Sequence, residues 1–238
     1  MPTRSRPSLA AVGLLLALAG CATTEQTRSV EASGFLKDYS QLKPGRGDQA
    51  LLVYINPQAD FSQYQKVIVD PVTIWYAEGS DLAGVPREEL QRLADYLETA
   101  MRKQLQLDFQ LVERPEPGTL RIRTAITEAR KSKVVLDLVS TVLPPARLLS
   151  QVGKLATGTH AFAGRAAIEG ELLDAVSNQR LVAVVDERAG GKALRGSTSA
   201  WADVQQAFDY WADVLRARLS AFRQFDAAQA GLEEALEK

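Results

Sequence analysis

The stretch "RAAIEGELLDAVSNQRLVAVVDE", residues 165–187, decides the fold of this chain. In its first half apolar residues alternate with charged ones, which is the period of a β-strand with one apolar and one polar face. Ser177 and Asn178 supply a turn, and residues 180–187 return as the antiparallel partner. The alternating positions of the first strand are Phe162, Ala166, Ile168 and Leu172 against Arg165, Glu169 and Glu171.

Other segments upstream of this hairpin also have strand character. Residues 119–129 place Leu120, Ile122 and Ile126 against arginines, which predicts a strand with one solvated face. Residues 50–55, 66–76 and 109–113 predict shorter strands. Pro71 interrupts the second of these, because proline cannot donate a hydrogen bond to a ladder, and an edge position or a bulge is expected there.

Two long segments have the period of amphipathic helices. Residues 85–106 begin with Pro86 and two glutamates and end with basic residues, as the helix dipole favours. A second helix is expected after Ser199, which is a suitable N-cap. The apolar stripes are Leu90, Leu93, Leu97, Met101 and Leu105 in the first helix, and Trp201, Val204, Phe208, Trp211, Leu215, Leu219 and Phe222 in the second.

Strands and helices in this order predict an α+β fold. The helices are too few for a doubly wound sheet, so we expect a two-layer sandwich with helices on one face of a mostly antiparallel sheet. Residues 34–225 are predicted to form a single domain. Residues 226–238 continue the last helix or fray, because Gly231 weakens them.

The N-terminus indicates export. Arg4 and Arg6 precede an uncharged apolar run at residues 9–18, which is about half the ~20 residues that a membrane-spanning helix needs. The run ends in Leu18-Ala19-Gly20-Cys21, which resembles the lipobox of bacterial lipoproteins. The resemblance implies a signal peptide at residues 1–20 and diacylglycerol on the Cys21 sulfur. It also implies cleavage before Cys21 and acylation of the new N-terminus, with palmitate as the expected chain.

The resemblance to bacterial lipoproteins also implies a location in the cell. Ala22 stands where an aspartate would tend to retain a Gram-negative lipoprotein in the inner membrane, so we expect an outer-membrane anchor facing the periplasm. Residues 21–33 are then the lipidated cysteine and a polar, flexible tether. No second cysteine is present, so the domain forms no internal disulfide in that oxidising compartment.

Composition and motifs argue against several activities. Removal of residues 1–20 takes away two arginines and no acid, so the net charge falls from −1 to −3 and no nucleic-acid partner is expected. His160 is the single histidine, which leaves no metal site and no Ser-His-acid triad. Glu169 and Glu171 are expected on a solvated strand face. We therefore expect no cofactor and no enzyme, although a hydrolase is not excluded.

The segment at residues 134–164 is unusual, since Val134 to Leu143 is nearly all apolar and Pro144 and Pro145 follow. One interpretation is a broken helix packed on the sheet. The other is an exposed apolar insert that meets a partner protein, a second copy or the lipid surface. The sequence leaves both open.

Three blocks carry a family resemblance: "SGFLKDYSQLKPG", "LVYINPQADFSQYQKVIVDPVTIWY" and "GTLRIRTAITEA". They resemble the bacterial lipoproteins grouped as domain of unknown function 3313. The resemblance covers residues 34–222 and implies an envelope lipoprotein without an assigned activity. We predict a non-enzymatic binding or scaffold protein of the bacterial envelope, held to the membrane through Cys21. The alternative is an oligomeric envelope or secretion component that self-associates through residues 134–164.

Overall fold

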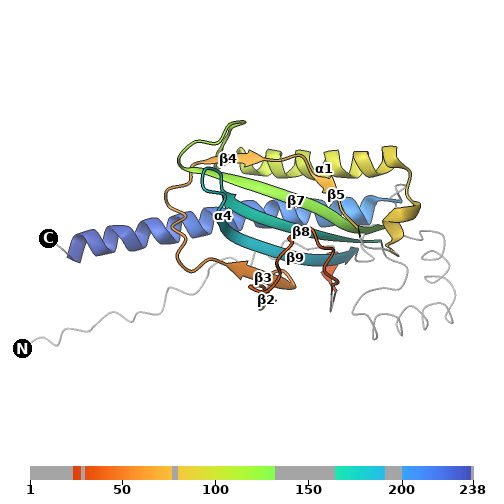
Figure 1. Cartoon of the computed structure of the whole chain (residues 1–238), viewed down its shortest axis with the longest axis horizontal. Helices are drawn as coiled ribbons and strands as arrows, with labels where there is room; N and C mark the ends of the chain where they lie inside the picture. Colours follow the sequence, from red (N-terminus) through yellow and green to blue (C-terminus); the bar gives the residue numbers. More distant parts are fainter. Residues whose placement is uncertain (1–23, 28–29, 77–79, 132–163, 191–199, 237–238) are drawn as a thin grey trace, which may run out of the picture.

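The computed structural model describes residues 24–27, 30–76, 80–131, 164–190 and 200–236. Its strands join one sheet in the order β2-β3-β9-β8-β7-β4-β6, with β1 paired to β9 and β5 paired to β7. The predicted α+β class is confirmed, and Figure 1 shows helix α4 running along strands β8 and β9. The strands are β1 (Thr24–Gln26), β2 (Lys43–Pro44), β3 (Leu52–Ile55), β4 (Lys66–Val69), β5 (Thr73–Ile74), β6 (Gln110–Leu111), β7 (Thr119–Arg130), β8 (Arg165–Asp174) and β9 (Arg180–Gly190), and the helices are η1 (Asp81–Gly84), α1 (Arg87–Leu105) and α4 (Ala202–Leu236).

The β8–β9 hairpin lies at the centre of the sheet, as its alternation predicts. Strand β8 is antiparallel to both β7 and β9, and the turn uses the left-handed conformation of Asn178, with φ of 58°. Strand β4, however, is parallel to β6 and β7. The chain crosses over through α1 between β4 and β6, and such a crossover returns the chain in the parallel direction.

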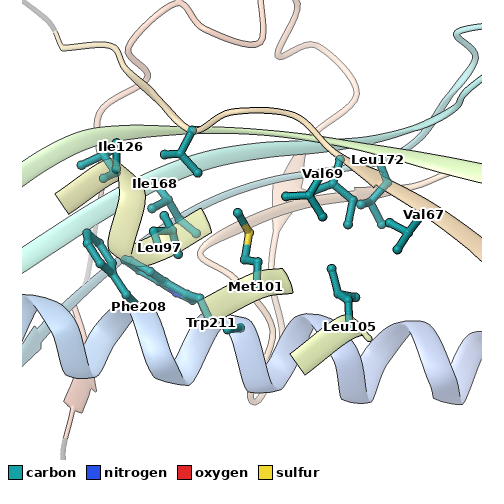
Figure 2. Close-up of a cluster of buried hydrophobic side chains, with 14 of the residues drawn as sticks. Val67, Val69, Leu97, Met101, Leu105, Ile126, Ile168, Leu172, Phe208 and Trp211 are labelled. Atoms are coloured by element: carbon teal, nitrogen blue, oxygen red, sulfur yellow. The ribbon is translucent and has the colours of Figure 1, made fainter. Parts of the chain in front are cut away.

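The main core lies between the helices and one face of the sheet. Figure 2 shows Phe208 and Trp211 of α4 beside Leu97 and Met101 of α1, all facing strand residues such as Ile168. The predicted stripes of both helices are confirmed: most members are buried, and Leu90, Trp201, Leu215 and Phe222 are half-buried against the same core.

The opposite face of the sheet is partly covered by the segment that precedes β2. Phe35 and Leu36 pack there against Ala125, Ala183 and Val185 in a second, smaller core. The expectation that Glu169 and Glu171 lie on a solvated face is therefore wrong, since they are 0% and 6% exposed. A segment without strand or helix periodicity covers them, which the alternation in β8 cannot reveal.

The N-terminal segment joins the sheet earlier than predicted. Residues 22–33 were expected to form a flexible tether, but Thr24–Gln26 pair with Gly190, Ala189 and Arg188 as strand β1. Arg188 donates from Nε to Thr24 Oγ1 and from Nη2 to the Thr24 carbonyl, both at 2.9 Å. Its guanidinium also lies 3.7 Å from the ring centroid of Tyr210. Thr24 is consequently buried, and the folded part of the chain begins before residue 34.

The remaining sequence predictions concern the two ends and the apolar insert. Helix α4 continues through Gly231 to Leu236, so the C-terminal tail is helical over those residues and projects past the sheet (Figure 1). Residues 132–163 lie outside the described residues, and so do Cys21 and Ser199. In the described part of the chain, no helix is long and apolar enough to cross a membrane.

Candidate functional site

A largely apolar cavity of about 160 Å³ lies between α4 and the sheet. Its lining includes the buried side chains of Leu97 and Met101 from α1. It also includes the loop at residues 48–50, where the exposed side chain of Asp48 marks the mouth. The walls come from strands β3 and β9 and from one face of α4. They include Val53, Ile55, Val182, Val184, Leu215 and Leu219.

The cavity exists because the sheet is wider than the helical layer that covers it. Contacts of α4 with the sheet are made to β8, β9 and β1, whereas β3 continues the sheet beyond β9. The helix-facing side chains of β3 are therefore incompletely covered, and Ile55 is 36% exposed. An apolar recess results at the side of α4 that lies towards β3.

Gly170 lines the cavity from the middle of β8. Its neighbours Glu169 and Glu171 are directed to the opposite face by the strand period, so position 170 points towards α4. A Cβ atom there would lie 3.5 Å from Val184 Cγ2 and 3.8 Å from Thr124 Oγ1, which are ordinary contacts. A methyl group therefore fits at position 170, in contact with the neighbouring side chains of the lining.

The cavity opens to solvent beside the exposed side chain of Asp48, so its apolar walls are in contact with water. Removal of apolar surface from water is favourable by roughly 25 cal/mol per Å². An apolar ligand that covers these walls would gain this free energy, so the cavity is the candidate binding site.

Charged groups stand at the mouth of the cavity. Arg218 Nη2 lies 2.7 Å from Asp48 Oδ1, and the guanidinium lowers the pKa of the Asp48 carboxyl. The Asp48 side chain is 84% exposed, so it can rotate away and leave Arg218 to an incoming anion. The mouth thus offers a cation beside an apolar interior.

Buried carboxylates near the cavity have structural roles. Asp186 accepts hydrogen bonds from Trp211 Nε1 at 2.8 Å, from Gln26 Nε2 at 2.6 Å and from Leu51 N at 3.2 Å. Glu171 accepts hydrogen bonds from Arg123 and Arg180. Burial raises the pKa of Glu187 and of Asp209, but neither residue lines the cavity.

The structure does not describe the residues that the sequence singled out for chemistry. Cys21 and His160 both lie outside the described ranges. Among the residues that are described, no group of three or more His, Cys, Asp or Glu side chains is placed to hold a metal ion. Sequence reasoning missed the cavity, although a glycine inside a strand is a signal for close approach of a ligand. Gly170 carries that signal.

Comparison with known proteins identifies the family. Residues 31–215 match a family described as protein of unknown function (DUF3313). The chain belongs to the DUF3313 family. This DUF3313 protein is also 32% identical over 212 residues to the uncharacterized lipoprotein YdcL of Escherichia coli K12, covering 88% of the chain and 94% of that relative. The YdcL protein of Escherichia coli O157:H7 matches to the same extent. The family resemblance predicted from the three sequence blocks is confirmed.

Solved structures resemble the DUF3313 chain more distantly. The PelC dodecamer from Paraburkholderia phytofirmans has a TM-score of 0.36 at 12% identity, covering 68% of this chain and 96% of PelC. Protein XCC0632 from Xanthomonas campestris has a TM-score of 0.42 at 10% identity, covering 73% of this chain and 94% of that protein. At such scores these likenesses carry no conclusion about assembly or ligand.

Proposed function

We propose that this protein is an outer-membrane lipoprotein, anchored through lipid on Cys21 and facing the periplasm, that binds an apolar chain without catalysing a reaction. The observation that carries the binding function is the cavity between α4 and the sheet. The lipobox and the 32% identity to a lipoprotein support the anchor.

The lining of the cavity selects the class of ligand. An apolar cavity of about 150 Å³ has room for a molecule the size of benzene. This cavity therefore takes the end of an acyl chain or a single ring rather than a whole lipid. Arg218 at the mouth favours a ligand with an anionic head, because guanidinium pairs well with carboxylate and phosphate. A fatty acid presents both features, and so does a phospholipid that inserts the end of one acyl tail and leaves its phosphate at the mouth.

Filling the cavity should separate binding from stability. Gly170→Val should lower the affinity for a fluorinated fatty acid at least tenfold, because the new side chain occupies the cavity. The same change should raise the free energy of unfolding by about 1 kcal/mol, since glycine weakens a strand interior and cavity filling stabilises. Fluorine NMR of the fatty acid and urea unfolding followed by circular dichroism measure the two effects.

Two further variants control this test. Gly170→Ala should give a smaller change of the same sign, and it guards against a clash of the valine with Val184. Gly84→Val, at an exposed site with no atom within 4 Å of the added Cβ, should leave binding unchanged. Unaltered binding by a folded Gly170→Val protein would place the ligand elsewhere. Mass spectrometry of organic extracts from wild-type protein would identify the natural ligand.

The anchor is tested separately. Cys21→Ser should abolish lipid attachment and leave the signal peptide uncleaved, because the acyl transfer requires the thiol as nucleophile. The N-terminal peptide of the wild-type protein should show the mass of a diacylglyceryl cysteine. The wild-type protein itself should fractionate with outer membranes. Recovery of wild-type protein that is cleaved before Cys21 but carries no lipid would contradict the proposal.

A further inference from the structure

The distance along the chain between the proposed anchor and the folded domain is very short. Strand β1 begins at Thr24, and only Ala22 and Thr23 separate it from Cys21. Three extended residues span at most about 11 Å. If Cys21 carries lipid, as proposed above, its sulfur lies at the bilayer surface, and Thr24 must lie close to that surface.

Strand β1 is held firmly enough for this short connection to orient the domain. It pairs with β9 over three residues, and Thr24 is bonded by the guanidinium of Arg188. Gln26 Nε2 donates to Asp186 Oδ1 and to the carbonyl of Gln49, which ties β1 to the loop before β3. The anchor therefore acts on the edge of a rigid sheet and not on a flexible leader.

We infer that the end of the sheet formed by Gly190, Arg165 and Arg130, together with η1, faces the membrane. Thr24 pairs with Gly190, Arg165 with Ala189 and Arg130 with Arg165, so these positions lie at one end of the strands. Helix α4 begins at this end, where Asp203 accepts a hydrogen bond from Gly164 N at 2.8 Å. Its C-terminal turns then point away from the bilayer (Figure 1).

The basic residues at this end suit a phospholipid surface. Arg130 and Arg165 are directly opposite each other across β7 and β8, and each side chain is 35% exposed. Their acidic neighbours Asp81 and Glu187 lie at 3.9 Å and 3.6 Å, longer than the 2.9 Å between Arg121 and Asp70. Because these ion pairs are long, the two guanidinium groups retain N–H donors for lipid phosphates.

Two thiol positions measure the orientation. Lipidation consumes Cys21, so a cysteine introduced at Ala83 in η1 or at Val176 in the β8–β9 turn is the only free thiol. These exposed positions lie at opposite ends of β8, whose ten residues span roughly 33 Å. Each purified lipidated variant is labelled with a fluorophore. It is then placed in phosphatidylethanolamine–phosphatidylglycerol vesicles that contain a headgroup nitroxide quencher.

We expect the label at Ala83→Cys to be quenched at least threefold more than the label at Val176→Cys. Insertion of twelve Gly/Ser residues between Ala22 and Thr23 should remove the difference, because a flexible linker of that length reaches about 20 Å. Equal quenching of the two labels without the insertion, or stronger quenching at Val176→Cys, would overturn the inferred orientation.

A failure of the anchor itself is recognised independently. The mass of the N-terminal peptide reports whether Cys21 carries lipid. If it does not, the proposed anchor fails, and the orientation is measured with a hexahistidine tag in place of Cys21 on nickel-chelating vesicles. The same ratio between the two labels then decides whether the β1 connection orients the domain.

Discussion

Replacing Trp211 with alanine is expected to lower the free energy of unfolding by about 3–5 kcal/mol, the usual cost of deleting a large buried aromatic side chain. The ring is 8% exposed and lies 6.1 Å from the ring of Phe208, centroid to centroid. Its Nε1 donates to Asp186, which also bonds β1 and the residue before β3. The substitution therefore enlarges the cavity and also removes one of the hydrogen bonds to the buried carboxylate of Asp186.

Urea unfolding followed by circular dichroism measures this effect without depending on tryptophan fluorescence. Trp211→Phe should cost less, because it keeps an aromatic ring and loses chiefly the hydrogen bond to Asp186. Phe225→Ala is the matched control on the same helix, since Phe225 is 68% exposed, and it should change the stability by no more than about 0.5 kcal/mol. A Trp211→Ala protein as stable as this control would show that the face of α4 over the cavity contributes nothing to the core.

The second large effect is expected for Glu169→Ala, at about 2–4 kcal/mol. Glu169 is fully buried and accepts hydrogen bonds from Ser33 N, Leu36 N and Tyr39 Oη. Removal of this single carboxylate leaves several donors unpaired beneath the covering segment, and each buried unsatisfied group costs about 1–3 kcal/mol. The segment around Phe35 and Leu36 should then open locally, with faster amide exchange at Leu36.

A titration provides an independent readout of the same contact. Burial first, and then the hydrogen bond to Glu169, raise the pKa of Tyr39 above its ordinary value of 10.0. The pKa of Tyr39 should therefore fall towards 10 in Glu169→Ala, as followed by ultraviolet absorbance. Glu31→Ala removes the same charge from an exposed position in the same segment and should alter neither property. Unchanged amide exchange in Glu169→Ala would mean that apolar packing alone holds the segment.

The sequence by itself determined the elements whose buried faces repeat with the period of a strand or a helix. The alternation at residues 165–187 predicts the β8–β9 hairpin, because a strand with one apolar face leaves a period of two. The stripes of α1 and α4 predict which faces are buried, since every turn of an amphipathic helix repeats the same choice. The family resemblance likewise needed only contiguous blocks of sequence.

Tertiary structure alone decided the features that depend on contacts between distant segments. Glu169 accepts a hydrogen bond from Ser33 N, which is 136 residues away in the sequence. The periodicity of a strand cannot indicate that a distant loop covers one of its faces. Strand β1 is polar and only three residues long, so its own sequence carries no strand signal. Its position comes from pairing with β9 and from the hydrogen bond that Arg188 donates to Thr24. The cavity at Gly170 depends on how far a sheet extends beyond its helices. The extent of the sheet beyond α4 is set by the packing of the whole domain, so no single stretch of sequence can predict it.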